Sequence, residues 1–554
     1  MRKQKLLFKA ATLLLAFVFA QTGVPFAGTA SSSYSKRETG LYRDVFDQSV
    51  YYEGTEPLHL ERLSRGLRGA GKRARNVNAF DEVPDSTFFT NRHGREPLSE
   101  GALKQGPAAD GGPDPGGDWA ITKGKFEGLT PGFFIRDSQG ERYLLKFDPI
   151  DNLELNTGAE AVTSRFLHAI GYPVPSYTLV SFKKEKLVID PQATIYDESG
   201  FQKKLTPEGL DEFLLFIPET GDGGYRASAS RILEGEILGP MKFQGRRRDD
   251  PEDTVNHEDR REIRALQVFA SWLNNNDMRE SNSLDVVQER DGQRRIWHYL
   301  IDFGSSLGAA SGGPKPPMFG HELMLDYGET LKAIFSFGFW KKPWQKRWDE
   351  AGREVQSPSI GYFDNRHFRP ARFRTQLPYF PFKDLTRSDG FWAAKILMRF
   401  TDDDIKVLVS TGEFSAKKAE EALAGTLIER RDLIGRYWFK QANPLDEFRF
   451  FNEGGAYELR FEDLAVRHGF VPETGSVYRV EVIAGKGKRR IRVAQEDIQE
   501  QTVRINSDWL TRYPSLDLLI RTRRPNAVTW GPFVRVRIES QAGVPRLAGI
   551  LHQD

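Results

Sequence analysis

Short apolar runs separated by polar turns characterise residues 130–182. Residues 133–136 and 142–147 flank a polar, glycine-containing turn, which is typical of a β-hairpin. In residues 157–170 the apolar positions instead recur at helical spacing, and Gly171 followed by Pro173 ends the pattern. Residues 177–182 return to a strand pattern. The predicted order is therefore hairpin, helix, strand.

A second alternation of periods begins near residue 256. Residues 256–274 carry apolar side chains at helical spacing, which predicts an amphipathic helix with one face toward a core. Residues 284–287 and 296–301 then read as strands around Asp291-Gly292, a strong hairpin-turn dipeptide. The second strand runs directly into Asp302, so the pattern predicts a helix followed by a hairpin that ends at an acidic residue.

The remainder of the chain divides into a helical and a β-rich part. Several amphipathic helices are expected between residues 343 and 439, including 403–409 and 416–437. After residue 443 the pattern changes to strands, at 477–482, 516–520 and 533–538. We therefore expect a small C-terminal β domain.

The N-terminal third has little periodicity. In residues 1–30 four basic side chains precede an apolar run of about 11 residues, shorter than the roughly 20 that span a bilayer, and small residues follow. This is the pattern of a secretory signal peptide, with an uncleaved anchor as the alternative, and both place the body outside the cytoplasm. Residues 31–99 read as an extended segment, and the Gly- and Pro-rich residues 101–118 as a flexible linker or long loop. No further stretch is apolar enough to cross a membrane.

Composition narrows the possible functions. A chain of 554 residues exceeds the roughly 250 to 300 that one core supports, so two or three folded units are expected. Basic and acidic residues are balanced at 79 to 77, which gives no reason to expect a nucleic-acid partner. The basic runs at 245–248 and 485–490 are interpreted as solvated loops. The absence of cysteine excludes disulfides, thiolate metal sites and thiol nucleophiles.

Four polar residues fall where phosphoryl transfer needs them. Transfer from ATP requires a cation on the phosphates, a carboxylate that orients the acceptor hydroxyl, and oxygen ligands for Mg²⁺. Lys146 ends an apolar strand and is suited to the phosphates. Asp277 follows the long helix as candidate catalytic base, and Asn282 and Asp302 are candidate metal ligands. Singly these signals are weak, but the order helix, Asp277, Asn282, hairpin, Asp302-Phe303-Gly304 is specific.

Residues 121–440 thereby resemble the protein-kinase-like superfamily, nearer to its atypical HipA-type and phosphoinositide-kinase-type branches. Residues 277–282 resemble the catalytic loop, 301–304 the metal loop and 143–146 the nucleotide-lysine strand. The resemblance implies an α+β fold with a two-lobed kinase-like core, binding ATP and Mg²⁺ and acting on a hydroxyl acceptor in a protein, sugar or lipid. It places Arg279 at the transferring phosphate.

The resemblance also suggests the remaining cofactor-binding residues and a division of the chain. Glu160 is the candidate partner of Lys146, although residues 157–160 also read as a capping box, and Glu154 is the fallback. Residues 226–239 correspond to the hinge that meets adenine, with Leu233 and Glu234 as candidates. The expected parts are a signal peptide (1–30), an N-terminal extension with linker (31–118), a small lobe with hinge (119–240), a large lobe (241–442) and a C-terminal β-rich domain (443–554).

Two alternative hypotheses remain open. No His-Arg pair precedes Asp277, residues 122–128 form a poor glycine-rich phosphate loop, and ATP is scarce outside the cytoplasm. These departures suit a catalytically inactive pseudokinase or a ligand-binding module of the cell envelope. A surface interaction protein that acts through the C-terminal β domain is compatible with either hypothesis.

Overall fold

The computed structural model describes most of the chain from Tyr34 onward, and the predicted signal peptide at 1–30 lies outside the described residues. The described ranges are 34–38, 41–52, 71–108, 111–125, 130–196, 201–316, 318–342, 344–346, 357–454, 456–485, 490–541 and 544–554.

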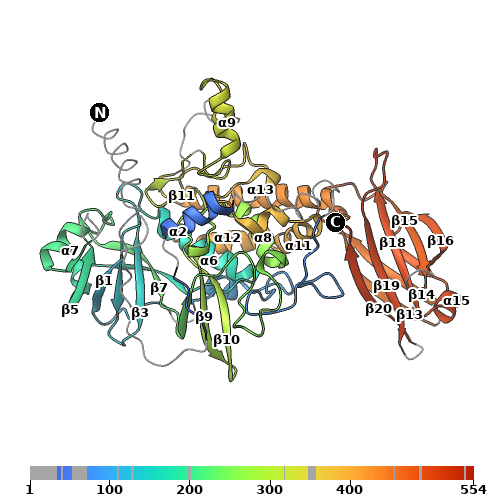
Figure 1. Ribbon diagram of the computed structural model, residues 1–554, viewed down its shortest axis with the longest axis horizontal. Helices are drawn as coiled ribbons and strands as arrows, with labels where there is room; N and C mark the ends of the chain where they lie inside the picture. Colours follow the sequence, from blue (N-terminus) through green and yellow to red (C-terminus); the bar gives the residue numbers. More distant parts are fainter. Residues whose placement is uncertain are drawn as a thin grey trace. The chain divides into compact units, whose positions relative to one another are not determined.

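A seven-stranded sheet forms the first layer, in the order β4-β7-β3-β2-β1-β5-β6 (Figure 1). Its strands are β1 (Trp119–Gly124), β2 (Gly132–Arg136), β3 (Arg142–Phe147), β4 (Tyr177–Phe182), β5 (Leu187–Tyr196), β6 (Gln202–Lys204) and β7 (Tyr225–Arg231). All neighbours pair antiparallel except β1 with β5. Alternate side chains of β1, β2 and β3, including Ile121, Phe133 and Leu145, build an apolar core with α7 (Pro207–Leu214). The predicted hairpin, helix and strand are all present.

β8 (Glu236–Gly239), β9 (Ser283–Arg290) and β10 (Gln293–Leu300) form a three-stranded antiparallel sheet. Asp291 and Gly292 form the β9–β10 turn with φ of 52° and 70°, and two consecutive positive φ angles are what a tight two-residue hairpin requires. The hairpin that the sequence predicts is therefore confirmed.

A helical layer carries the largest core. The helices are α6 (Leu155–Ile170), α8 (Arg261–Trp272), α11 (Arg387–Leu397), α12 (Asp402–Ser410) and α13 (Lys417–Gln441). α11 packs on both α8 and α13, and Trp272, Phe269, Trp392 and Phe400 are fully buried where these helices meet. Mixed helices and strands with one large sheet confirm the predicted α+β class.

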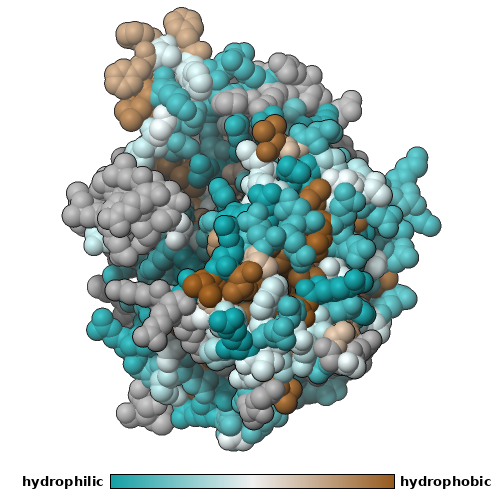
Figure 2. All heavy atoms as spheres, turned by 90° about the vertical axis from the view of Figure 1, so that its right-hand side faces the viewer, coloured by the Kyte–Doolittle hydropathy of each residue, from teal (hydrophilic) through white to brown (hydrophobic). Residues whose placement is uncertain are grey.

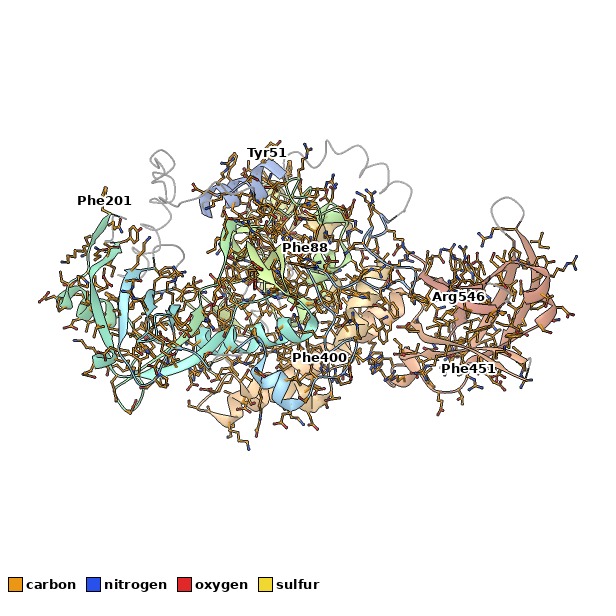
Figure 3. All side chains as sticks on the ribbon, turned by 90° about the horizontal axis from the view of Figure 1, so that it is seen from below. Tyr51, Phe88, Phe201, Phe400, Phe451 and Arg546 are labelled. Atoms are coloured by element: carbon orange, nitrogen blue, oxygen red, sulfur yellow. The ribbon has the colours of Figure 1, made fainter. Side chains whose placement is uncertain are left out.

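The segment before β1 is part of this core. Residues 71–99 have no helix or strand, as expected of the predicted extended segment 31–99, but residues 41–52 of that segment form the helices α2 (Leu41–Phe46) and η1 (Asp47–Tyr52). Phe88 (Figure 3) and Phe89 are nevertheless buried, Phe88 stacked on His298 of β10 and Phe89 against Trp392 of α11. The prediction of a flexible linker at 101–118 is wrong at its start, because Glu100–Gln105 form the helix α5, which buries Leu103 and packs on α12. Ser99 caps α5, so the glycine-rich composition that follows did not prevent a helix.

The C-terminal strands form two antiparallel sheets around a separate core. The sheets have the orders β13-β14-β17 and β16-β15-β18-β19-β20. Their strands are β13 (Leu445–Glu453), β14 (Ala456–Asp463), β15 (Val477–Ala484), β16 (Ile491–Ile498), β17 (Thr502–Ile505), β18 (Ser515–Arg523), β19 (Phe533–Gln541) and β20 (Val544–His552). Val480, Leu518 and Val536 are fully buried between the sheets. Every strand predicted after residue 443 is present.

Short elements complete the fold. They are α2 (Leu41–Phe46), η1 (Asp47–Tyr52), η3 (Lys184–Lys186), η4 (His257–Asp259), η5 (Glu280–Asn282), β11 (Ala309–Ala310), β12 (Gly313–Pro314), α9 (Tyr327–Phe335), η6 (Pro370–Arg372), η7 (Phe380–Asp384), α14 (Leu464–Arg467) and α15 (Ser507–Arg512). None of α9 is buried, and its apolar residues and those after it, such as Phe335 and Phe337, are exposed (Figure 2). Within the described ranges no helix is long and apolar enough to span a membrane.

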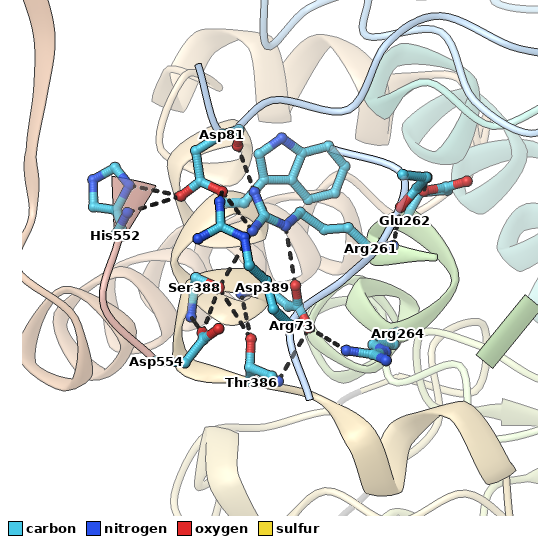
Figure 4. Close-up of polar contacts among 12 residues, drawn as sticks. Arg73, Asp81, Arg261, Glu262, Arg264, Thr386, Ser388, Asp389, His552 and Asp554 are labelled. Atoms are coloured by element: carbon cyan, nitrogen blue, oxygen red, sulfur yellow. Dashed lines mark hydrogen bonds and ion pairs between the residues drawn. The ribbon is translucent and has the colours of Figure 1, made fainter. Parts of the chain in front are cut away.

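Charged residues predicted to be solvated are in part buried. Arg261 and Arg264 of α8 are fully buried and form ion pairs with Asp81 and Asp389 (Figure 4). In the sequence, the charges at helical spacing in residues 260–266 indicate either a solvated face or ion pairs within the chain, and the structure shows ion pairs. The prediction of a solvated loop at 245–248 is wrong for Arg247, whose guanidinium lies 3.1 Å from Asp285 with 10% of the side chain exposed. Asp285, the buried acid that pairs with this arginine, lies in β9 and is 38 residues away in the sequence, so the local sequence does not reveal the pair.

Candidate active site

Lys146 is the centre of a buried ion-pair cluster. It lies at the end of β3, and its Nζ is 2.5 Å from Oε1 of Glu160 and 2.9 Å from Oδ1 of Asp302. The second Glu160 oxygen accepts a hydrogen bond from Ser228 at 2.5 Å. Burial acts to lower the pKa of Lys146, but Asp302 and Glu160 outweigh it and raise that pKa. The lysine is therefore a permanent cation held between helix α6 and the end of the β9–β10 hairpin.

Asp148 fixes the start of α6 and thereby the position of Glu160. Its carboxylate accepts hydrogen bonds from the backbone N–H groups of Glu154, Asn156 and Thr157 and from the Thr157 hydroxyl, at 2.8 to 2.9 Å. This satisfies several of the N–H groups that a helix start leaves unpaired. The capping-box interpretation of residues 157–160 is wrong, because α6 begins earlier and Glu160 points to Lys146.

Glu154, the fallback partner of Lys146, has a different place. Its two carboxylate oxygens accept from the backbone N–H of Ser415 at 3.1 and 3.0 Å. It thus ties the start of α6 to the loop between α12 and α13, away from the ion-pair cluster.

Asp277, Arg279 and Asn282 form one compact loop after α8. Arg279 lies 3.3 Å from the Asp277 carboxylate and donates to Oδ1 of Asn282 at 3.2 Å. The Asn282 amide donates to the Asp277 carbonyl at 2.8 Å. These three residues line a single hollow together with Asp302. The loop therefore presents a carboxylate, a guanidinium and an amide oxygen to the same space.

Asp302 connects this loop to the lysine. It has a φ of 62°, a left-handed conformation that is uncommon for a non-glycine residue and is found preferentially at functional sites. Its N–H donates to the Tyr177 hydroxyl at 3.2 Å, and the adjacent Ile301 N–H donates to the carbonyl of Asn282 at 3.0 Å. Asp302 therefore lies beside both Lys146 and Asn282.

The two aspartates have opposite electrostatic environments. Burial raises the pKa of Asp277, with a further increase from the charge of Asp302, and Arg279 only partly opposes this. Partial burial also disfavours ionised Asp302, but Lys146 and Lys125 outweigh it and lower its pKa to about 2. Two carboxylates whose pKa values are displaced in opposite directions are typical of a site where one accepts a proton and the other binds a cation.

The oxygen donors at this point are of the type that Mg²⁺ prefers. Asp302 and Asn282 offer hard oxygen atoms, and 37% of the Asp302 side chain is exposed. No group of three or more His, Cys, Asp and Glu residues in the described ranges is arranged to hold a metal. Two protein ligands suffice for Mg²⁺, which usually takes its other ligands from water and substrate phosphates. His257 and His298 pair with Asp253 and Asp285, respectively.

Sequence reasoning missed three residues of the site. Lys125 comes from the segment judged a poor phosphate loop. Its side chain lies against Gly132, 3.4 Å from where a Cβ would stand if Gly132 carried a side chain. Gly132 is the residue that pairs with Lys146 across β2 and β3. Lys315 is buried and donates to the carbonyls of Asn274 and Ser305 and to the amide oxygen of Asn276. The position of Lys125 just after a strand was the only sequence signal for a role in the site. The contacts of Lys315 depend on tertiary folding and left no signal in the sequence.

Asn156 is the third residue. Its side-chain amide is buried without a hydrogen-bond partner among the described residues. The Asn156 and Glu160 side chains both lie next to Gly304, 3.5 and 3.6 Å from where a Cβ would stand if Gly304 carried a side chain. A buried amide without a partner is rare and calls for a ligand or a water molecule.

The hinge candidates lie elsewhere. Leu233 and Glu234 connect β7 to β8 and line a different hollow with Arg231 and Trp297. The Glu234 side chain is 80% exposed and pairs with Arg231. The structure therefore does not bring these two side chains to Lys146 and Asp302.

The fold and the site define an α+β protein in which a buried Lys-Glu-Asp cluster adjoins an Asp-x-x-x-x-Asn loop. No family model and no curated protein sequence matches the chain. Among solved structures, the Helicobacter pylori proinflammatory kinase CtkA is similar at 13% identity and a TM-score of 0.30, over 58% of this chain and 96% of that one. The Golgi casein kinase is similar at 9% identity and a TM-score of 0.28, over 74% and 93%. Scores this low carry no weight, so function must be inferred from the site itself.

Proposed function

We propose that this protein is an ATP- and Mg²⁺-dependent phosphotransferase of atypical kinase type that acts on a hydroxyl acceptor outside the cytoplasm. The observation that carries the proposal is the double pairing of Lys146 with Glu160 and Asp302. In protein kinases the pairing of this lysine with a helix glutamate, and a metal-binding aspartate in place, are both required for transfer. Unlike the fully buried ion pairs of Arg261, this cluster is open to solvent on one side, because 37% of the Asp302 side chain is exposed.

The roles follow from the chemistry of each group. Lys146, with Lys125 beside it, would neutralise nucleotide phosphates, and Asp302 and Asn282 would hold Mg²⁺, which would offset the charge of the phosphates. Asp277, whose pKa is raised, would orient the acceptor hydroxyl and accept its proton. Arg279, 3.3 Å from Asp277, supplies a cation at the transferring phosphate. Glu160 keeps Lys146 in place.

The location of the activity belongs to the proposal as well. The basic and apolar pattern of residues 1–30 supports export, into the periplasm or the medium or with an uncleaved N-terminal anchor. The acceptor would then be a hydroxyl of an exported protein, a sugar or a lipid.

Thermal unfolding of the full chain with and without ATP and Mg²⁺, followed by transfer of labelled γ-phosphate, tests this function. We expect ATP with Mg²⁺ to raise the unfolding temperature, and Asp302→Ala to abolish the increase. No nucleotide-dependent stabilisation of the parent would exclude the phosphotransferase. Stabilisation without transfer to any acceptor or to water would instead support a catalytically inactive ligand-binding module.

A further inference from the structure

A hollow far from Lys146 in the sequence is lined by arginines and by no acidic residue. It has a volume of about 400 Å³, within the range of ligand pockets, and lies between residues 73–79 and the strands β19 and β20. Its lining residues are Arg73, Ala74, Arg75, Val77, Asn78, Ala79, Arg535, Arg537, Ala548, Gly549, Ile550 and Leu551. Four of the twelve are arginines, so the hollow carries an excess of positive charge.

The backbone holds the two sides of the hollow together. The Ile550 N–H donates to the carbonyl of Ala79 at 2.8 Å. Gly549 must be a glycine here, because a Cβ at that position would lie 2.8 Å from the same carbonyl oxygen. Residues 73–79 therefore run close along β20, and the arginines from both sides are fixed around one space.

Arg535 and Arg537 point to the same face of β19, since alternate residues of a strand share a face. Arg537 is held by the Asp517 carboxylate at 2.8 and 3.1 Å, and Arg73 by Asp81 at 2.8 Å. In contrast, no hydrogen-bond or ion-pair partner of the Arg75 and Arg535 guanidinium groups lies among the described residues. Two of the four arginines thus keep their donors for a ligand.

The like charges also act on one another. Partial burial lowers the pKa of Arg535, the charges of Arg537, Arg490 and Arg73 lower it further, and Asp517 only partly opposes this. An anion in the hollow would remove this repulsion. Guanidinium groups offer paired N–H donors that match the oxygens of a phosphoryl group.

We propose that this hollow binds a phosphoryl group, with Arg75 and Arg535 as its direct ligands and Arg73 and Arg537 as supporting cations. The source is either free phosphate or a phosphorylated side chain of a polypeptide. The site is separate from the proposed phosphotransferase centre and does not depend on it.

Isothermal titration of the full chain with inorganic phosphate, a phosphoserine peptide and its unphosphorylated form tests the proposal. Arg535→Ala and Arg75→Ala should weaken phosphate binding about ten to a hundredfold, the effect of losing one charged hydrogen bond. Neither substitution removes an internal partner, so both variants should fold. The matched control is Arg546→Ala, an exposed arginine of β20 outside the hollow (Figure 3).

The outcomes separate the sources and the sites. Tighter binding of the phosphoserine peptide than of phosphate identifies a phosphorylated polypeptide as ligand, and equal binding identifies free phosphate. Binding that persists in Lys146→Met supports a site distinct from the proposed nucleotide centre. Absence of phosphate and phosphopeptide binding in the parent, unchanged affinity in both arginine variants, or equal binding of the unphosphorylated peptide would overturn the proposal.

Discussion

Replacing Glu160 by glutamine separates the functional role of its contact with Lys146 from its structural role. The two carboxylate oxygens accept from Lys146 and Ser228, each at 2.5 Å. A glutamine of the same shape has one oxygen and one NH₂ group. Its NH₂ group would therefore face either the Lys146 ammonium or the Ser228 hydroxyl, both of which are donors. Lys146 would also lose one of its two acidic partners and keep Asp302.

The magnitude follows from these contacts. Losing a hydrogen bond to a charged group costs about 1.5 to 3 kcal/mol of unfolding free energy. The cost stays below the roughly 3 to 5 kcal/mol of a fully broken buried pair, because Asp302 still compensates Lys146. A displaced lysine would reduce phosphate transfer by about a hundredfold or more, as the loss of other positioned electrostatic groups does in enzymes.

Glu154→Gln is the matched control, because Glu154 is also buried at the start of α6 but contacts Ser415. It should lower stability by less, because its amide oxygen can still accept from the Ser415 N–H, and it should leave transfer of labelled γ-phosphate near the parental rate. Stability is measured by denaturant unfolding, and transfer with labelled ATP. Equal loss of transfer in both variants, or parental transfer in Glu160→Gln, would refute the reasoning.

Two further predictions concern charge. Asp277 must be ionised to accept a proton, and its pKa is raised above the ordinary aspartate value of 3.8. As the pH is lowered, the transfer rate should therefore begin to fall at a pH above 3.8. Because Arg279 acts to lower the pKa of Asp277, Arg279→Gln should move this fall to a higher pH in a pH–rate profile. An acid limb that stays in place or moves to lower pH would contradict this assignment. Arg261→Met should cost about 3 to 5 kcal/mol in denaturant unfolding, since it leaves buried Asp81 and Asp389 without their main cation, and a near-parental midpoint would contradict it.

Features set by neighbouring residues could be predicted from the sequence. The Asp291-Gly292 turn determines its own hairpin, because few residues adopt two consecutive positive φ angles. The helical period of residues 157–170 located α6 to within two residues at its start. From these elements the positions of Lys146, Asp277 and Asp302 followed, and the structure brings all three to one centre.

Features set by distant residues could not be predicted. The cap of α6 comes from Asp148, which lies before the helix and outside any local capping pattern. The charges of α8 read as a polar helix face until Asp81, 180 residues earlier, is seen to pair with Arg261.

The extended segment before Glu100 should be indispensable for folding. Phe88 and Phe89 are 5% and 0% exposed in the largest core, and Asp81 pairs with Arg261 and His552. Deleting one buried phenylalanine costs about 3 to 5 kcal/mol. Losing both therefore removes roughly 6 to 10 kcal/mol, most of the 5 to 15 kcal/mol that stabilises a typical domain.

A chain that begins at Glu100 should consequently fail to unfold cooperatively, whereas one that begins at Lys36 should unfold as the full chain does. Circular dichroism during thermal unfolding and the rate of trypsin cleavage distinguish the two. Cooperative unfolding of the shorter chain near the parental temperature would show that residues 71–99 only cover a core that is complete without them. In that case Phe88 and Phe89 would contribute far less to the free energy of unfolding than their burial implies.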